Sequence, residues 1–221
     1  MSFGPGYQKI ETFFNRDRAT FKINAAQTRV PEFGAVTQWL VEEKLDGQNI
    51  RIHVRGPVEE PMIVTYNGRT DNAQLSGPVR KMMDETTGRV FAASSRPELF
   101  FEEFTLYGEA VGPKIQSNPH HLLEPTLVLF DVRIQTFPDG YYWASRELVL
   151  EWAKMLGCWT PPVLGTLKLN EIVELVRNGF PVVFNSGMGD ARAEGVICRP
   201  SHELKTQRGE RVIWKLKTKD F

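Results

Sequence analysis

Short runs of strand-forming residues, separated by turn residues, recur along most of the chain and constrain its fold most strongly. In residues 50–54 apolar and polar side chains alternate, which is typical of a strand with one buried face. Residues 62–66, 105–110 and 126–134 are further apolar, β-rich runs. We therefore expect an α+β fold with a core rich in sheet.

Helical periodicity appears between these runs. A short helix is predicted over residues 78–87, with the glycine that follows as its end. A second helix is predicted from Ser145, a typical N-cap residue, to Gly157. A third is predicted to be capped by Asn170 and to end before Gly179.

Length and charge balance narrow the class of protein. A length of 221 residues suits one large domain or two small ones, and because no internal repeat or low-complexity linker divides the sequence, we expect a single domain over residues 1–221. Its 27 Lys and Arg residues balance 27 Asp and Glu residues. A protein that holds nucleic acid mainly by bulk charge would have a pI above about 9. That class is excluded, while a basic groove on a neutral protein stays open.

The sequence also predicts a cytoplasmic protein without a membrane partner. Its first residues lack the pattern of a signal peptide, and no apolar run approaches the roughly 20 residues of a membrane span. The two cysteines, Cys158 and Cys198, stand alone with no C-x-x-C pattern. This usage suits a reducing compartment and excludes a disulfide scaffold.

The sharpest local pattern is Glu43-Lys44-Leu45-Asp46-Gly47, at a break between two predicted strands. A lysine at the edge of a strand, beside a glycine that permits a tight backbone, can present its amine to a phosphate. The competing interpretation is a surface hairpin turn that carries charged residues. Taken alone, the pattern favours the hairpin turn.

Two further lysines lie in a predicted tail strand, which we expect to pair with residues 196–198. On a strand Lys215 and Lys217 share one face, and neighbouring ammonium groups repel unless an anion lies between them. The competing interpretation is a solvated edge strand, where lysine prevents aggregation. Taken alone, the pair favours the edge strand.

Four more residues have a functional and a structural interpretation. Glu109 and Glu194 suit a metal ligand, a ribose contact or a charge at the rim of a site. Arg69 follows an Asn-Gly turn, and its guanidinium either holds a phosphate or faces water. Phe130 lies in an apolar strand, where core packing is the usual role.

The order of these patterns is more informative than any one of them. Read from the N-terminus, they resemble motifs I, Ia, III, IIIa, IV and V of the covalent nucleotidyltransferases, which include polynucleotide ligases and mRNA capping enzymes. The matching residues are Lys44, Arg69, Glu109, Phe130, Glu194, Lys215 and Lys217. The chain is most similar to the RNA-ligase-2-like group. DNA ligases and capping enzymes usually carry arginine five positions after the motif I lysine, where this chain has Asn49.

The resemblance implies an ATP-grasp-like ligase domain, rich in antiparallel sheet, with a few packed helices. It implies an ATP-dependent RNA ligase of RNA repair, with Mg²⁺ or Mn²⁺ as the metal and RNA ends or a nicked duplex as the partner. Such an enzyme transfers AMP from ATP to Lys44, passes it to an RNA 5′-phosphate and joins that end to a 3′-hydroxyl.

By the same resemblance Lys44 is the nucleophile, and Lys215 and Lys217 are catalytic. A free lysine has a pKa near 10.4, so at pH 7 well under ~1% of it is the neutral, reactive amine. Nearby positive charge lowers such a pKa, and the two tail lysines and a divalent cation are the available sources. The same charges would stabilise the negative charge that develops on the α-phosphate.

The resemblance also implies residues that contact the nucleotide, namely Glu43, Arg69, Glu109, Phe130 and Glu194. Among these Glu194 is the implied metal ligand, Glu109 the contact of the ribose hydroxyl, and Phe130 the contact of the adenine. Asp46 and Asn49 are the implied contacts of the nucleic-acid substrate.

Two alternatives stay open. The first has the same chemistry and is a DNA nick ligase or a GTP-using capping enzyme. The second is of another class, a non-catalytic module that binds nucleotides or RNA ends. The intact Lys44 and tail lysines argue against that module, because binding alone needs no nucleophile.

Members of this group usually continue into a C-terminal domain, whereas this sequence stops four residues after Lys217. We therefore expect efficient self-adenylylation but weak capture of RNA ends, since few phosphate contacts would hold the RNA. A partner protein or a second copy of the chain can supply the missing clamp.

Overall fold

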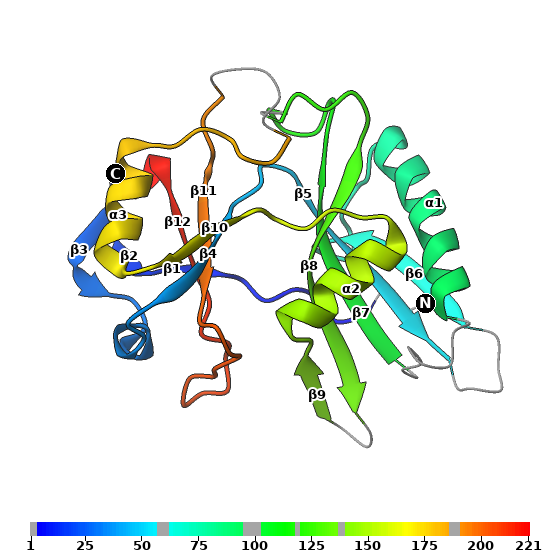
Figure 1. Cartoon of the computed structure of the whole chain (residues 1–221), viewed down its shortest axis with the longest axis horizontal. Helices are drawn as coiled ribbons and strands as arrows, with labels where there is room; N and C mark the ends of the chain where they lie inside the picture. The colour runs from blue at the N-terminus through cyan, green and yellow to red at the C-terminus, as the bar shows by residue number, and fades with distance from the viewer. Residues whose placement is uncertain (1–3, 57–61, 95–102, 118–119, 137–139, 186–190) are drawn as a thin grey trace. The chain divides into compact units, whose positions relative to one another are not determined.

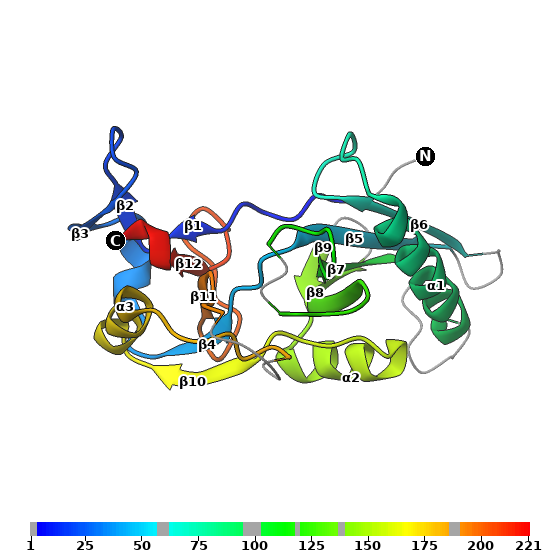
Figure 2. The same ribbon diagram turned by 90° about the horizontal axis from the view of Figure 1, so that it is seen from above.

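The computed structural model describes residues 4–56, 62–94, 103–117, 120–136, 140–185 and 191–221. Contacts divide the chain into two compact units: unit 1 consists of Met1–Gln8, Gly47–Asn118 and Leu122–Thr160, and unit 2 of Lys9–Asp46, Pro119–His121 and Pro161–Phe221. Each unit has a five-stranded sheet and its own apolar core. Figure 1 and Figure 2 label the strands of both sheets. The predicted α+β class is confirmed. That residues 1–221 act as a single domain stays a prediction.

Unit 1 contains an antiparallel sheet in the order β6-β5-β7-β8-β9. Its strands are β5 (Gln48–Arg55), β6 (Ile63–Gly68), β7 (Glu103–Val111), β8 (Thr126–Thr136) and β9 (Gly140–Trp143). The alternation seen in residues 50–54 arises because β5 lies in the middle of this sheet, with its apolar side chains on the core face.

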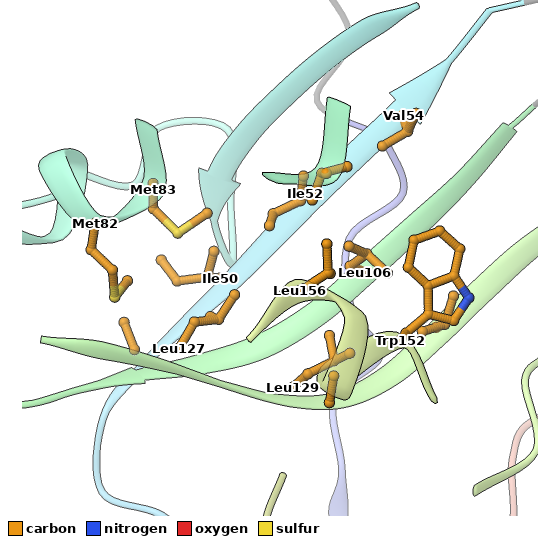
Figure 3. Close-up of a cluster of buried hydrophobic side chains, with 14 of the residues drawn as sticks. Ile50, Ile52, Val54, Met82, Met83, Leu106, Leu127, Leu129, Trp152 and Leu156 are labelled. Carbon is orange, nitrogen blue, oxygen red and sulfur yellow. The ribbon is translucent and has the colours of Figure 1, made fainter. Parts of the chain in front are cut away.

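Two helices cover the core face of the unit 1 sheet. The helix α1 (Gly77–Ser94) packs against β6, and α2 (Arg146–Leu156) packs against β8. Figure 3 shows the core that results, in which Ile52 of β5, Met83 of α1 and Trp152 of α2 belong to one buried cluster. Full burial of one aliphatic side chain contributes roughly 1.5–3 kcal/mol, and many such side chains hold the helices on the sheet.

The ends of α2 are as predicted. The Ser145 hydroxyl accepts a hydrogen bond from Leu148 N–H, and Gly157 ends the helix in the left-handed conformation with φ of 61°. The end predicted for α1 is wrong, because that helix continues beyond the glycine at position 88 to Ser94. The residues Val90 and Ala93 are buried there, and their burial outweighs the glycine cost of about 1 kcal/mol.

Unit 2 contains a sheet in the order β1-β12-β11-β4-β10, in which β1 pairs in parallel and the other neighbours are antiparallel. Its strands are β1 (Glu11–Thr12), β4 (Trp39–Glu43), β10 (Val163–Leu167), β11 (Gly195–Arg199) and β12 (Trp214–Lys217). The strands β2 (Phe14–Arg16) and β3 (Ile23–Thr28) form a separate ribbon, and the 3-10 helix η1 (Pro31–Ala35) follows it. The core is centred on Trp39 and Trp214, whose ring centres are 5.2 Å apart.

The helix α3 (Leu169–Asn178) packs beside β12 and the 3-10 helix η3 (Thr218–Asp220). Its predicted start is wrong, since the N-cap is Lys168 rather than Asn170. The Lys168 N–H donates to the Glu171 carboxylate at 2.7 Å, so an acid in the first turn satisfies the helix start in place of a capping side chain. Among the described residues, no helix has both the length and the apolar composition needed to cross a membrane.

The strand pairing contradicts both surface interpretations of the lysines. The strand β4 pairs with β10 and β11, whereas β5 pairs with β6 and β7, so Lys44 does not stand in a hairpin turn. The strand β12 lies between β1 and β11, so Lys215 and Lys217 do not stand on an edge strand. The predicted pairing of the tail strand with residues 196–198 is confirmed, because β12 pairs with β11.

Candidate active site

Three of the predicted residues meet within unit 2. The Lys44 ammonium donates a hydrogen bond to Glu194 Oε2 at 2.5 Å, and the Lys217 ammonium donates one to Glu194 Oε1. The exposed fraction of the side chain is 19% for Lys44, 20% for Glu194 and 17% for Lys217. One carboxylate thus holds two ammonium groups in a site that solvent still reaches. We call these residues the lysine–glutamate trio.

Backbone contacts fix the strand ends that carry the trio. The Lys44 N–H, just after β4, donates to Gly195 O at 2.9 Å, and Thr218 N–H donates to Glu194 O at 3.0 Å. Gly195 has φ of 153°, and a Cβ at this position would lie 2.1 Å from Leu216 O. Only glycine lets β11 and β12 approach so closely. The functional side chains therefore stand on ordered strand ends.

The charges of the site favour an anion. The trio carries two positive charges and one negative charge at neutral pH. Lys215 adds a further cation on the same face of β12 as Lys217, because the residues between and before them, Leu216 and Trp214, are buried on the other face. An excess of positive charge in a partly desolvated site attracts phosphate groups and stabilises the charge that develops on them.

Glu43 comes directly before Lys44 but is committed to the protein interior, with 1% of its surface exposed. Its Oε2 accepts hydrogen bonds from Val183 N–H at 2.9 Å and from Phe184 N–H at 2.7 Å. Burial raises the pKa of Glu43, and the two N–H groups oppose that rise. Glu43 thus ties residues 183–184 to the end of β4, directly before Lys44. Its contact with a nucleotide stays a prediction.

His120, which no sequence pattern marks as a site residue, is buried beside Glu43. The His120 Nδ1 atom lies 3.9 Å from Glu43 Oε1. Burial lowers the pKa of His120, while the Phe184 backbone and the charge of Asp46 oppose the change. Asp46 is half-buried and near enough to act on this ring, and its contact with nucleic acid stays a prediction.

The other predicted residues lie in unit 1. Asn49 on β5 is directly opposite Glu109 on β7, so the two side chains share a face of the sheet. The Asn49 Oδ1 atom is buried and has no hydrogen-bond partner among the described residues. Glu109 is half-buried, and Arg69 is exposed directly after β6. An asparagine oxygen without a partner is a position where a ligand could donate a hydrogen bond.

Phe130 stands at a β-bulge. The pairing of β7 with β8 shifts so that Tyr107 is opposite Asp131 and Gly108 is opposite Leu129, which leaves Phe130 as the extra residue. A bulge redirects a side chain, and the Phe130 ring is half-buried and outside the apolar cluster of unit 1. Phe130 is therefore not a member of the unit 1 core.

Tyr7 is a second residue that no sequence pattern marks as part of the site. Its ring centre lies 5.0 Å from that of Phe130 and 5.0 Å from that of Tyr107, and its hydroxyl donates to the Asp131 carboxylate. Tyr7 and Asp131 are 124 residues apart in sequence. No local pattern in the first residues carries a signal for such a contact.

A metal ion at this site would have few protein ligands. Among the described residues, no three His, Cys, Asp or Glu side chains gather into a site that could hold a metal ion. Mg²⁺ does not need such a cluster, because it keeps several waters and binds through one or two carboxylates together with substrate phosphates. Glu194 is the carboxylate of the trio and fits that donor set.

A lysine on a strand end, held beside a carboxylate and a second lysine in an antiparallel-rich α+β fold, fits the class of covalent nucleotidyltransferases. The family model described as RNA ligase matches residues 37–217, a range that includes every site residue predicted from the sequence. The chain belongs to the RNA ligase family, as the order of its motifs predicts. No curated protein sequence matches the chain significantly.

Solved structures of an RNA ligase from Naegleria gruberi have a similar fold. An apo form of a variant matches with a TM-score of 0.61 and 16% identity over 97% of this chain and 59% of that chain. A variant with ATP and Mn matches with a TM-score of 0.60 and 16% identity over 97% of this chain and 60% of that chain. The ligase with PPi matches with a TM-score of 0.58 and 15% identity over 96% of this chain and 61% of that chain. This chain thus spans 59% to 61% of the length of those ligases, and at such identity the likeness shows the fold.

Proposed function

We propose that this chain is an ATP-dependent RNA ligase that works through a covalent lysyl-AMP. The observation that carries the proposal is the Glu194 carboxylate between the Lys44 and Lys217 ammonium groups, in a chain of the RNA ligase family. The Naegleria gruberi ligases of similar fold were solved with ATP and Mn and with PPi, which supports ATP as the nucleotide here. RNA repair is the process that such an enzyme would serve.

In the first step the neutral Lys44 amine attacks the α-phosphorus of ATP. A P–N bond forms, the P–O bond to the β-phosphate breaks, pyrophosphate leaves, and the nitrogen releases one proton to water and keeps one hydrogen in the phosphoramidate. Lys215 and Lys217 stabilise the negative charge on the phosphate oxygens in the transition state. Glu194 would hold a divalent cation, Mg²⁺ or Mn²⁺, whose charge offsets that of the phosphates.

The next two steps transfer the AMP and join the RNA. An oxygen of the RNA 5′-phosphate attacks the phosphorus of lysyl-AMP, the P–N bond breaks, and a 5′–5′ pyrophosphate linkage forms. The 3′-hydroxyl then attacks the phosphorus of the former 5′-phosphate, and AMP leaves. Asp46 and Asn49 would contact the nucleic acid in these steps.

The nucleotide contacts that we propose are Glu43, Arg69, Glu109, Phe130 and Glu194. Phe130 would lie against the adenine, a role that its half-buried ring at the bulge supports. Glu109 would accept a hydrogen bond from a ribose hydroxyl. Arg69, an exposed cation, would contact the ribose or a phosphate.

Intact mass after incubation with ATP and Mg²⁺ tests the proposal. The wild-type chain should gain the mass of one AMP, and Lys44→Ala should gain none. Lys44→Arg should also fail, because its guanidinium stays protonated and is a poor nucleophile. The control is Lys154→Ala, which removes an exposed lysine of α2 and should leave labelling unchanged. Native labelling of Lys44→Ala would refute the proposal.

The alternatives predict other results in the same assay. A GTP-using capping enzyme would be labelled by GTP rather than ATP. A DNA nick ligase would seal a DNA nick faster than an RNA nick of the same sequence. A non-catalytic module would bind ATP and gain no covalent AMP.

A further inference from the structure

The residues after β12 hold a buried acid. Thr218–Asp220 form η3, which packs beside α3 (Figure 1). Asp220 is 2% exposed. A carboxylate at this depth needs partners, because an unpaired buried charge is strongly unfavourable.

The two oxygens of Asp220 bind different parts of unit 2. Oδ2 accepts a hydrogen bond from the Lys217 backbone N–H at 2.9 Å, and Oδ1 accepts one from Arg16 Nη2 at 2.5 Å. Arg16 is the last residue of β2 and lies 204 residues from Asp220 in sequence. The resulting path of contacts runs through Arg16, Asp220, Lys217, Glu194 and Lys44.

Two more cations fasten the same segment. Lys22, between β2 and β3, donates from Nζ to Lys219 O at 3.1 Å and to Phe221 O. The Arg177 guanidinium of α3 lies over the Phe221 ring, 5.0 Å from its centre. The backbone around Asp220 is therefore held from two sides.

Lys217 is the last residue of β12, so the hydrogen bond at its N–H sets where its side chain leaves the sheet. We propose that Asp220 is a positioning residue for the adenylylation of Lys44, acting through Lys217. The inference rests on the proposed function above. Misplacing a group by about 1 Å can slow a positioned reaction on the order of 10²-fold, so a fixed Lys217 has a direct effect on rate.

The test measures the rate constant of AMP transfer to Lys44 in the whole chain at saturating ATP with Mg²⁺. Asp220→Ala removes both hydrogen bonds, and we expect a loss of about tenfold or more. Asp220→Asn keeps an oxygen for the Lys217 N–H and should stay within about threefold of the wild type. A native rate for Asp220→Ala overturns the proposal.

A double-mutant cycle distinguishes positioning from a merely structural role. Lys217→Ala should slow AMP transfer on the order of 10²-fold or more, because it removes a cation beside the α-phosphate. Adding Asp220→Ala to that variant should slow it by no more than about twofold, since Asp220 acts through the lost side chain. A further tenfold loss would show that Asp220 acts independently of Lys217, and it overturns the proposal.

Arg211→Ala is the matched control for Asp220→Ala, because Arg211 and Glu203 form another ion pair of unit 2. In this pair Arg211 is buried and Glu203 is partly exposed. Their side chains are 3% and 35% exposed, against 2% and 31% for Asp220 and Arg16. This control should lower Tm and leave the rate of AMP transfer unchanged.

Two outcomes remain to be separated. If Asp220→Ala does not fold, Arg16→Ala takes its place in the double-mutant cycle with Lys217→Ala. The proposal then requires that adding Arg16→Ala to Lys217→Ala slows AMP transfer by no more than about twofold. A wild-type chain that gains no AMP refutes the proposed function. A wild type that is labelled, together with variants that match its rate, refutes the positioning role alone.

Discussion

Removing the negative charge at the centre of the lysine–glutamate trio should destabilise the folded chain. In Glu194→Gln, two ammonium groups lose the carboxylate that stands between them. Two ammonium groups that bind the two oxygens of one carboxylate are roughly 5 Å apart. At that distance they repel each other by about 3 kcal/mol in a partly solvated site. The amide oxygen still accepts one hydrogen bond, so we expect a net loss of about 2 kcal/mol in the free energy of unfolding.

The assay is thermal unfolding followed by circular dichroism at low ionic strength, without nucleotide. For a chain of this size a loss of about 2 kcal/mol lowers Tm by roughly 4–8 °C. Salt at about 1 M should narrow the difference, because the Debye length falls to about 3 Å. Glu174→Gln, which changes an exposed acid of α3, is the control and should leave Tm unchanged.

A second substitution shows whether repulsion is the cause. Adding Lys217→Met to Glu194→Gln removes one of the two ammonium groups and should restore more than half of the lost stability. A Tm for Glu194→Gln within about 1 °C of the wild type would refute the reasoning, because that difference is under about 0.5 kcal/mol. A double variant less stable than the single variant would refute it as well.

Two further predictions follow from Phe130 and from the buried histidines. Phe130→Ala should weaken the use of ATP roughly 5- to 150-fold, because stacking of a base on an aromatic ring is worth about 1–3 kcal/mol. Equal labelling of the wild type by ATP and GTP would contradict an adenine contact at Phe130. Burial lowers the pKa of His120 and of His53, a buried residue of β5, from the ordinary value of 6.5, so the unfolded chain binds more protons as the pH falls through that value. The free energy of unfolding should therefore decrease below about pH 6.5, and His120→Gln should reduce the slope in urea titrations.

Features with local causes could be predicted from the sequence. Ser145 and Gly157 set the ends of α2 by their own side chain and backbone, so their positions alone were sufficient. The end of α1 could not be found in this way, because burial of Val90 and Ala93 against the unit 1 core carries the helix past a glycine.

The candidate site also contains features that the sequence could predict and features that it could not. The trio could be proposed because each of its members lies in a pattern of a known family, although no pattern said that Glu194 would bridge the two lysines. The break after Lys44 could not be assigned locally, since a hairpin and a change of sheet use the same turn residues. Arg16 and Asp220 carried no signal, because their pairing depends on how the ribbon and η3 meet in the folded unit.

The strand order of unit 2 has a consequence for the time at which the protein becomes reactive. The strand β4 is synthesised early, but its neighbours β10 and β11 come much later, and Lys44 and Glu194 are 150 residues apart. The strand β12 must then enter between β1 and β11. Such distant contacts form slowly, since the entropy of closing long loops is lost before the contacts form. During translation the unit 1 sheet can close first, while β4 stays unpaired and prone to aggregation, and Lys44 gains its contact with Glu194 late.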